Sequence, residues 1–533
     1  MTTGPLFLGV DVGTGSARAG LFDASGRMLA AAKRDIRMWR EAGSVVEQSS
    51  DDIWQAVCAA VREAVADAAI DTAAVAGIGF DATCSLVLLG PGGQPVTVSP
   101  SGDPARNIIV WMDHRALDQA QRINAGHHDV LRYVGGVISP EMETPKLLWL
   151  REHLPDSYRG AWQFLDLADF LTWRATGDLA RSSCTVTCKW TYLAHESRWD
   201  ADYFRAIGLG DLADEGFARI GQRVVAPGTP LGAGLTTQAA AELGLRAGTP
   251  VGAGLIDAHA GGLGTVGAFG DPQANLGYVF GTSSCTMTST GRPVFVPGVW
   301  GPYFDAMVPG LWLNEGGQSA AGAAIDQLVR FHPAWPEAQA AAEAARLPLP
   351  VWLAERAAEA APDASAAIDL AAGLHVVPEF LGNRAPFADP HARAIIAGLG
   401  MERDIANLTA LYVAGLSGIG YGLRQIVETQ ERAGAPVARV VISGGAGQSG
   451  LVRQLLADAA GLPVAAVTAE EPVLLGSAIL GAVAAGTHSS AVDAMQAMTH
   501  RGPQYSPAPD RAEQHRHRYD VFQALQAAAR SNR

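Results

Sequence analysis

The feature that most constrains this chain is a short polar turn that occurs twice. The tetrapeptide GTGS at 13–16 lies within LGVDVGTGSARAGLFD, and GTSS at 281–284 lies within NLGYVFGTSSCTMTST. In both places an apolar run enters the turn and another leaves it, a pattern typical of two β-strands joined by a tight turn. The repeat indicates weak internal symmetry and predicts two comparable halves with a boundary near residue 268.

The remaining pattern is that of an α/β protein. Glycine-marked apolar strands recur at 75–90, 250–264 and 439–450, and amphipathic helices lie between them. The segment 49–69 begins with Ser and Asp capping residues and then carries an apolar residue at every fourth position. Strands that alternate with helices predict sheets covered by helices.

Two segments are expected at the surface. The alanine-rich stretch 338–367 predicts exposed helices. Residues 491–533 predict a loop followed by a final helix. Within that helix, histidines at alternate positions of HRHRY (515–519) do not share a face, so a solvated surface is favoured over a metal site.

Charge and hydropathy exclude several kinds of partner. Lys and Arg total 39 and Asp and Glu total 53, so the formal net charge is −14. This disfavours nucleic acid, whose binding relies on cationic contacts to phosphates. No basic region with a cleavable apolar segment opens the sequence, and the longest strongly apolar stretch, 472–486, is shorter than the ~20 residues that span a bilayer. We expect a soluble cytoplasmic protein without a nucleic-acid or membrane partner.

The five cysteines are few for this length and odd in number, so the sequence does not indicate a disulfide framework. Cys184 and Cys188 are four residues apart, but no second cysteine pair or nearby histidine accompanies them. Thiols of the core or surface are therefore favoured over zinc ligands.

The first turn has the composition of a phosphate site. Hydroxyl side chains and glycines that expose backbone N–H groups can cradle phosphate oxygens. Asp11, on the strand before the turn, would repel a phosphate group unless a cation lay between them. The carboxylate and the turn together therefore predict a site for phosphate with Mg²⁺. A plain hairpin turn is the alternative. A Walker loop is excluded, because the pattern G-x-x-x-x-G-K-[ST] does not occur.

A second carboxylate follows a later strand. Asp257, in GLIDAHAGGLG at 254–264, precedes small residues that let a helix pack closely. An acid in this position can act as general base toward a sugar hydroxyl. It can equally cap the helix that follows.

Other polar clusters suit a ligand with many hydroxyl groups. Glu315 stands before two glycines and Gln318 on a turn into an alanine-rich helix. In VWMDHRA, Trp111 offers an aromatic plate beside the hydrogen-bonding Asp113, although a cluster at the start of a helix explains the same residues. Lys189, among small and aromatic residues, can bond a carbonyl or hydroxyl group, although a lone lysine is usually at the surface.

A competing motif lies near the C-terminus. Residues 445–450 read G-x-G-x-x-G after a strand and before a helix, with Glu470 and Glu471 about twenty residues on, which matches the dinucleotide fingerprint. An NAD-dependent dehydrogenase is therefore an alternative. Against it, too little chain follows the motif to complete a six-stranded sheet, and both hydroxyl-rich turns and Asp257 stay unexplained.

Taken together, the motifs resemble the FGGY carbohydrate kinase family, in order, over residues 5–490. The resemblance implies two duplicated actin-like ATPase domains, ribonuclease H-like in fold, around a central cleft. Residues 1–268 would carry the sugar site and the catalytic base, 269–490 the nucleotide site, and 491–533 the final loop and helix. The segments GVDVGTGSARA, WMDHRA, GLIDAHAGGLG, EGGQS and FLGNRAPFADP look most like the pentulose kinases of the D-ribulokinase type.

The resemblance also implies roles for single residues. Asp11 would lie near the metal and the γ-phosphate, and Asp257 matches the catalytic base. The positions that match nucleotide contacts are Gly13, Thr14, Ser16, Gly281, Thr282, Ser283, Gly322, Gly444, Gly445 and Ser449. The positions that match sugar contacts are Asp81, Ala82, Trp111, Asp113, Lys189, Asp257 and Glu315. Xylulokinases carry a Met-His pair where this chain has Asp81 and Ala82, which argues against xylulose.

The implied reaction is ATP-dependent phosphorylation of a ketopentose. D-ribulose is the expected substrate, with L-ribulose or ribitol as alternatives, and ATP and Mg²⁺ are the expected cofactors. Closure of the two domains over both substrates is expected to exclude water. A homodimer is compatible with this assignment. A noncatalytic ATP sensor is a further alternative, which Asp257, Lys189 and Glu315 disfavour because a sensor needs none of them.

Overall fold

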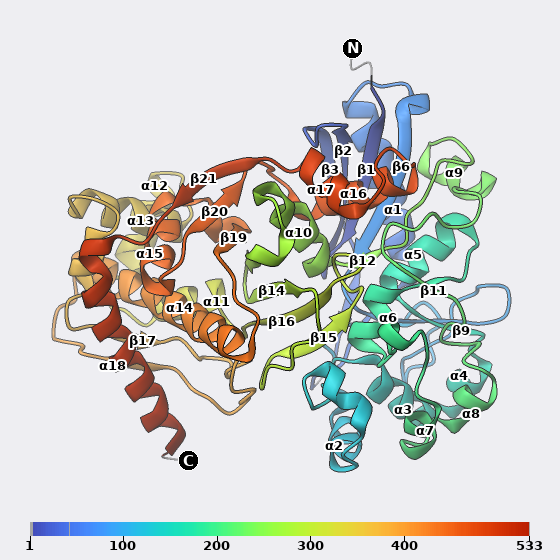
Figure 1. Cartoon of the computed structure of the whole chain (residues 1–533), viewed down its shortest axis with the longest axis horizontal. Coiled ribbons are helices and arrows are strands. Elements are labelled where there is room, and N and C mark those ends of the chain that lie inside the picture. The colour runs from blue at the N-terminus through green and yellow to red at the C-terminus, as the bar shows by residue number, and fades with distance from the viewer. Residues whose placement is uncertain (1–3, 42, 532–533) are drawn as a thin grey trace.

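The structure is a computed structural model that describes residues 4–41 and 43–531, and it consists of two lobes side by side (Figure 1). Most of the first half of the chain, blue to green, builds the right-hand lobe. Most of the second half, yellow to red, builds the left-hand lobe. Each lobe contains one large sheet with helices packed against it, as the alternating pattern of the sequence predicts.

The central sheet of the first lobe has five strands in the order β12-β6-β1-β2-β3. The three strands β12, β6 and β1 are parallel, and β2 and β3 follow as antiparallel neighbours. The tight turn at 13–16 joins β1 to β2, so the predicted strand pair is confirmed. The strand bounds are β1 Leu6–Val12, β2 Ser16–Asp23, β3 Met28–Asp35, β6 Val75–Ala82 and β12 Leu255–Ile256.

The sheet of the second lobe has seven strands in the order β15-β16-β14-β13-β19-β20-β21. Read from β20 to β16, five of them repeat the order and the directions of the first sheet, with the turn at 281–284 between β13 and β14. The predicted duplication is therefore present in the strand topology. The strand bounds are β13 Asn275–Phe280, β14 Ser284–Thr290, β15 Trp300–Phe304, β16 Trp312–Gln318, β19 Arg439–Ser443, β20 Val464–Val467 and β21 Arg501–Tyr505.

Two helices pack against each other between the sheets. Helix α10 (Asp257–Val266) follows the last strand of the first sheet and contacts β13 and β19 of the second. Helix α16 (Pro472–Ala484) comes from the second half of the chain but lies on β1 and β6 of the first sheet. Each half thus contributes a helix to the other lobe, so the packing of the two lobes does not follow one division of the sequence.

Glycines allow this close packing. A Cβ atom at Gly9 of β1 would lie 2.0 Å from the carbonyl oxygen of Leu474, and one at Gly79 of β6 would lie 2.0 Å from that of Ser477. Any side chain at these positions would collide with the backbone of α16, so only glycine lets the helix touch the sheet. Gly9 of β1 and Gly79 of β6 therefore allow α16 to pack directly on the sheet.

Further helices and a second sheet complete the first lobe. In the first lobe, α1 (Ser50–Asp67) packs on β2 and β3, and Ser49 caps it as predicted. A second five-stranded sheet and further helices belong to the same lobe. Their bounds are β4 Met38–Arg40, β5 Val46–Gln48, β7 Leu86–Leu89, β8 Ile108–Ile109, β9 Gln163–Asp166, α2 Leu117–Ala125, α3 Glu143–His153, α4 Pro155–Gly160, α5 Leu167–Thr176, α6 Ser183–Lys189, α7 Ala201–Ala206, α8 Gly210–Asp214 and α9 Thr237–Leu243.

The second lobe is covered by the long helix α14 and its neighbours. The alanine-rich segment forms helices, but one face of each is buried, as Ala338 and Leu353 show. The helix bounds are α11 Gly322–Arg330, α12 Trp335–Ala344, α13 Leu349–Ala360, α14 Ile405–Ala433 and α15 Gly450–Ala460.

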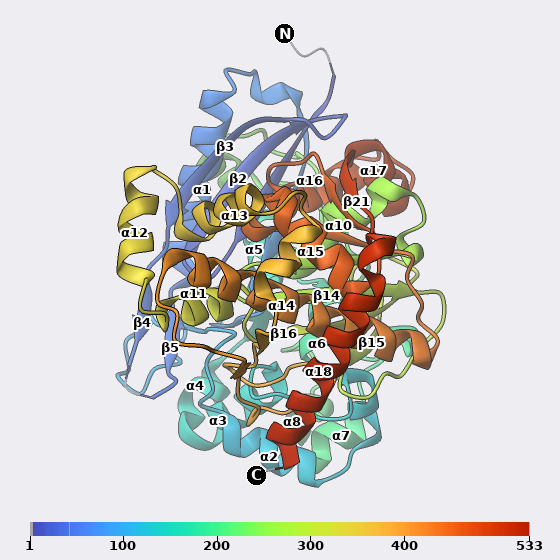
Figure 2. The ribbon, with the colours of Figure 1, turned by 90° about the vertical axis from the view of Figure 1, so that its left-hand side faces the viewer.

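The C-terminal segment departs from the prediction of a loop and a helix. It forms helix α17 (Ala491–Met498), the edge strand β21, which pairs with β20, and helix α18 (Ala512–Ser531). Helix α18 runs across the face of the second lobe and contacts α14 and α15 (Figure 2). His515 is buried there, with its Nδ1 2.9 Å from the hydroxyl of Tyr421, so the solvated surface predicted for 515–519 is wrong at this residue.

Candidate active site

Hydrogen bonds within the first hydroxyl-rich turn and from neighbouring segments fix its conformation. The backbone N–H of Gly13 donates to the carbonyl of Ser16 at 3.0 Å and closes the turn. From a neighbouring segment, the indole N–H of Trp111 donates to the hydroxyl of Thr14 at 3.0 Å. Gln48 fixes the turn from the other side by donating to the Thr14 carbonyl at 2.8 Å.

Asp11 lies near the end of β1, immediately before this turn. Its carboxylate accepts from Arg18 Nε at 2.6 Å, and Arg18 also reaches Glu471 at 2.7 Å. In the parallel register, Asp81 of β6 lies beside Asp11. Burial raises the pKa of Asp81 well above its usual value, and the Asp11 carboxylate raises it further. Asp81 therefore binds its proton more tightly than an exposed aspartate does.

The second turn, in the other lobe, is also closed by a backbone hydrogen bond. The N–H of Gly281 donates to the carbonyl of Ser283 at 2.9 Å, and the N–H of Gly322 donates to the carbonyl of Gly281 at 3.0 Å. Gly322 is the first residue of α11, so the N-terminal end of that helix abuts the turn. Backbone N–H groups at a helix N-terminus favour bound anions.

The loop after β19 lies against this second turn. Gly444 has a φ of 94°, and a Cβ there would lie 2.3 Å from the carbonyl oxygen of Phe280, the last residue of β13. Gly445 is exposed, and Ser449 caps α15 by accepting from the N–H of Val452 at 3.4 Å. The fold thus brings Gly444 beside the second turn from more than 150 residues away in the sequence.

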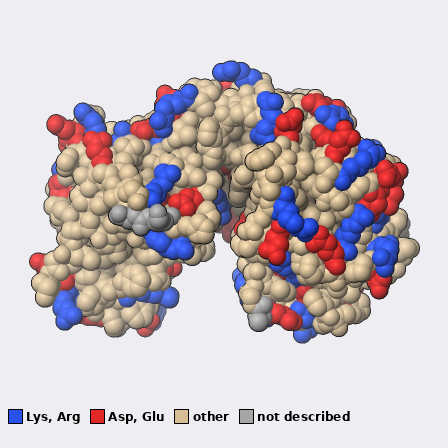
Figure 3. Space-filling view, turned by 90° about the horizontal axis from the view of Figure 1, so that it is seen from below, with Lys and Arg blue, Asp and Glu red and all other residues tan. Residues whose placement is uncertain are grey.

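The two turns face a cavity of about 280 Å³ that draws its walls from both lobes. The molecular surface is hollowed between the lobes (Figure 3). The predicted site residues that line this cavity are Asp11, Gly13, Thr14, Trp111, Lys189, Asp257, Gly281, Thr282, Ser283 and Glu315. Ser16 lines an adjoining hollow together with Gly13 and Arg18.

Asp257 occupies a position suited to proton transfer. It is the first residue of α10, and its Oδ1 accepts from the N–H of Ala258 at 2.7 Å. The N-cap position is Ile256, so Asp257 lies one residue beyond the position that the capping alternative gives it. Burial raises the pKa of Asp257 to about 6, and the Asp11 carboxylate adds to the rise. A carboxylate with a pKa near the working pH can accept a proton from a hydroxyl group.

Glu315, on β16, is a charged acid within the same wall. Burial alone would raise its pKa, but Lys189 and His259 outweigh burial and lower it to about 2. His259 Nε2 lies 3.3 Å from Glu315 Oε2. Because the group is ionised at every working pH, it is an acceptor only, which suits a sugar hydroxyl.

The cavity also has walls that sequence reasoning missed. Trp300 has two cations near its ring, with Lys189 Nζ 5.2 Å and Arg384 Cζ 5.5 Å from the ring centre. Glu141 and Cys84 complete this end of the cavity. Arg384 lies in FLGNRAPFADP, a segment that contributed to the family resemblance, but no local pattern connects it with the first lobe.

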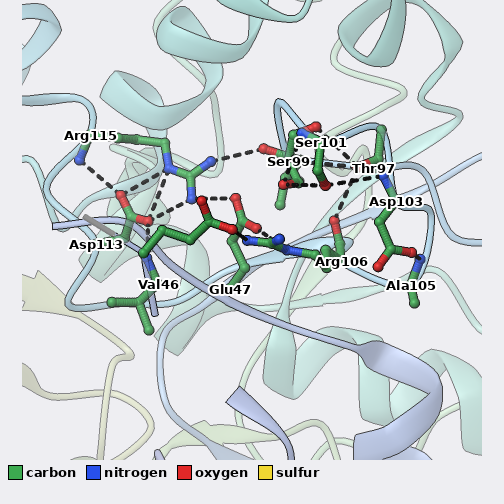
Figure 4. A network of polar contacts seen from close by, with 12 residues as sticks. Val46, Glu47, Thr97, Ser99, Ser101, Asp103, Ala105, Arg106, Asp113 and Arg115 are labelled. Atoms are coloured by element: carbon green, nitrogen blue, oxygen red, sulfur yellow. Dashed lines mark hydrogen bonds and ion pairs between the residues drawn. The ribbon is translucent and has the colours of Figure 1, made fainter. Parts of the chain in front are cut away.

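Three predicted sugar contacts do not line the cavity. Asp113 is fully buried, and its carboxylate accepts from the N–H of Val46 at 2.7 Å and from Arg115 (Figure 4). Arg115 also binds Glu47, so the acid belongs to an internal ion-pair network. Asp81 accepts from the hydroxyl of Ser477 at 2.5 Å, and it is buried with Ala82. In this structure Asp113 and Asp81 thus bind other protein groups and do not face the cavity.

Comparison with known proteins agrees with this geometry. Residues 6–264 match the N-terminal domain, and residues 276–485 the C-terminal domain, of the FGGY family of carbohydrate kinases. The chain therefore belongs to this family and is a carbohydrate kinase. The resemblance noted from the sequence is confirmed, and so is the two-domain actin-like fold.

Individual relatives cover nearly the whole chain. The FGGY carbohydrate kinase domain-containing protein of Homo sapiens is 45% identical over 97% of this chain and 96% of its own length. The D-ribulokinase of Saccharomyces cerevisiae is 38% identical over 90% of this chain and 72% of its own length. The xylulose kinase structure from Rhodospirillum rubrum superposes with a TM-score of 0.80 at 23% identity over 99% of both chains, which shows the shared fold.

The dehydrogenase alternative is wrong. The G-x-G-x-x-G motif at 445–450 does follow a strand and precede a helix, but that strand, β19, is central to the duplicated sheet and not to a six-stranded dinucleotide fold. Within residues 4–41 and 43–531, no helix has the length and apolar character needed to cross a membrane.

Proposed function

We propose that this carbohydrate kinase transfers the γ-phosphoryl group of ATP to a terminal hydroxyl of D-ribulose, giving D-ribulose 5-phosphate. The observation that carries this proposal is the position of Asp257, which lies in one cavity with both hydroxyl-rich turns. A base, two phosphate cradles and a polar wall are the parts that in-line phosphoryl transfer requires.

Asp257 acts as the general base. Its pKa of about 6 leaves it ionised at neutral pH, yet basic enough to take the hydroxyl proton as the oxygen attacks phosphorus. The backbone N–H groups and hydroxyls of the turns stabilise the charge that spreads over the transferred group. No phosphorylated enzyme intermediate is needed.

Asp11 is the residue proposed to bind Mg²⁺. The donors at this point, the Asp11 carboxylate and the hydroxyl of Thr14, are hard oxygen atoms, which Mg²⁺ prefers. When bound, the ion would neutralise phosphate charge. Arg18, which contacts Asp11 in this structure, would then be free to pair with phosphate oxygens or with Glu471 alone.

Both lobes supply residues to the cavity. Residues 1–268 contribute Asp257 and Lys189, and residues 269–490 contribute Glu315 and the second turn, so the cavity is complete only when both lobes are present. Movement of the lobes over both substrates would exclude water, which could otherwise accept the phosphoryl group. The nucleotide lies with the loop at 444–449 and Gly322 on the second lobe.

D-ribulose is proposed because the yeast relative that covers most of the chain is a D-ribulokinase. The sugar would lie between Trp111 and Trp300, with Lys189 and Glu315 bonding its carbonyl and hydroxyl groups. Ribitol differs from D-ribulose only in the oxidation level of one carbon, and L-ribulose is its mirror image with the same functional groups, so these two are the alternative substrates.

The test is ADP release from ATP and Mg²⁺ with a panel of D-ribulose, L-ribulose, D-xylulose, ribitol and glycerol. Turnover is expected with D-ribulose and to be at least about tenfold lower with each of the others, as differences in one hydroxyl contact allow. Faster turnover of another sugar would overturn the choice of substrate but keep the kinase. Background release with every sugar would favour an ATP sensor.

A further inference from the structure

Three soft ligand groups meet behind the cavity wall. Cys184 and Cys188 are four residues apart on α6, which places both thiols on one face of the helix. His259, on α10, faces them, and all three side chains are buried. The two Sγ atoms and a ring nitrogen of His259 lie within 4.8 Å of one another.

This spacing is close to that of a metal centre. The donors of one tetrahedral zinc ion lie about 3.5–3.8 Å apart. Cys184 Sγ is 3.1 Å from His259 Nδ1, so small shifts would place the three atoms around one ion. Sequence reasoning missed this arrangement because His259 is 71 residues beyond Cys188, and only the tertiary contact between His259 and Cys184 joins them.

The second nitrogen of the ring strengthens the assignment. A histidine that binds a metal usually donates its other N–H to a carboxylate, which fixes the ring and raises its basicity. Here His259 Nε2 faces Glu315 Oε2 at 3.3 Å. With Nδ1 toward the thiols and Nε2 toward the carboxylate, the ring has the orientation of a ligand with its outer partner.

Charge balance also favours a cation. Metal binding deprotonates a neighbouring thiol. Two thiolates with one divalent ion are neutral, and the remaining charges of Glu315 and Lys189 balance each other.

We propose that Cys184, Cys188 and His259 bind one zinc ion. Paired thiolates and an imidazole select zinc over Mg²⁺, so this site is separate from the metal position at Asp11. Three protein ligands leave the fourth position to a small molecule such as water. The ion would tie α6 to α10 and hold Glu315 through His259, a positioning role that rests on the proposed function.

The experiment measures the metal content of the full chain, expressed in zinc-supplemented medium and dialysed against a chelator to strip surface ions. Inductively coupled plasma mass spectrometry is expected to find about one zinc ion per chain in the natural protein. Cys188→Ser is expected to lower this at least about tenfold, because a hydroxyl is a poor zinc ligand. Cys58→Ser, a buried thiol on α1, is the matched control and is expected to keep the ion.

A second measurement covers the case in which Cys188→Ser does not fold. Natural protein grown with cobalt in place of zinc is expected to show the intense near-ultraviolet absorption of thiolate bound to Co²⁺. Natural protein with less than about 0.1 zinc ion per chain and no such absorption would overturn the site. Equal zinc in the natural protein and a folded Cys188→Ser variant would also overturn it. Neither readout depends on turnover, so failure of the proposed kinase reaction would leave the metal result intact.

Discussion

Replacing Asp257 by asparagine tests the proposed base directly. Asparagine has nearly the same shape and keeps an oxygen that can accept from the N–H of Ala258, the contact seen at 2.7 Å. The fold and both binding surfaces should therefore persist. What is lost is the ability to take a proton from the sugar hydroxyl.

The size and pH dependence of the effect follow from the environment of Asp257. Burial, with a further contribution from Asp11, raises its pKa to about 6. The base acts when deprotonated, so kcat/KM is expected to fall on the acid side of pH 6, by about tenfold per pH unit. Asp257→Asn is expected to lower the turnover at pH 7.5 by about 10²–10⁴-fold and to abolish this acid limb.

The assay is the rate of ADP formation with saturating ATP and Mg²⁺ and with the best sugar of the panel well below its KM, measured between pH 5 and pH 8. Under these conditions the rate reports kcat/KM, which product release does not limit. Asp118→Asn, an exposed acid in the first turn of α2, is the control and is expected to match the natural protein. A variant at Asp257 that keeps its rate within about threefold, or keeps the acid limb, would refute the assignment of the base.

Two further predictions concern binding and stability. Glu315→Gln is expected to raise KM for the sugar about tenfold or more with KM for ATP unchanged, because a charged acceptor is lost; the effect should be constant from pH 5 to pH 9, since its pKa of about 2 keeps Glu315 ionised. An equal rise in both KM values would contradict its place in the sugar wall. Gly79→Ala puts a Cβ 2.0 Å from the Ser477 carbonyl and should lower the free energy of unfolding by about 1–3 kcal/mol in urea titrations, whereas Gly160→Ala, with no atom within 4 Å of the added Cβ, should not. Equal midpoints for the two variants would show that α16 does not rest on the sheet at Gly79.

Much of the fold was predictable because its signals are local. The strand pairs around 13–16 and 281–284 follow from apolar runs interrupted by glycine and hydroxyl residues, and Ser49 marks the start of α1. The edge strand β21 escaped prediction, because its exposed, polar residues gain their strand conformation only by pairing with β20.

Within the site, the sequence located the groups that stand at strand ends. Asp11 lies near the end of the apolar strand β1 and Asp257 directly follows β12, and in this fold the ends of parallel strands meet at one edge of a sheet. Asp113 shows the limit of such reasoning. It lies in a motif typical of a sugar contact, yet its carboxylate is taken up by Arg115 and the N–H of Val46.

The sequence by itself thus determined the α/β class, the duplication, the two hydroxyl-rich turns and the acids beside them, because each depends on residues close together in the chain. Tertiary structure alone decided which distant side chains meet. It set α16 on the first sheet through Gly9 and Gly79, and brought Arg384 into the cavity. It also placed His259 between two thiols and Glu315. Packing between elements fixes these contacts, and no periodicity or spacing in the chain encodes them.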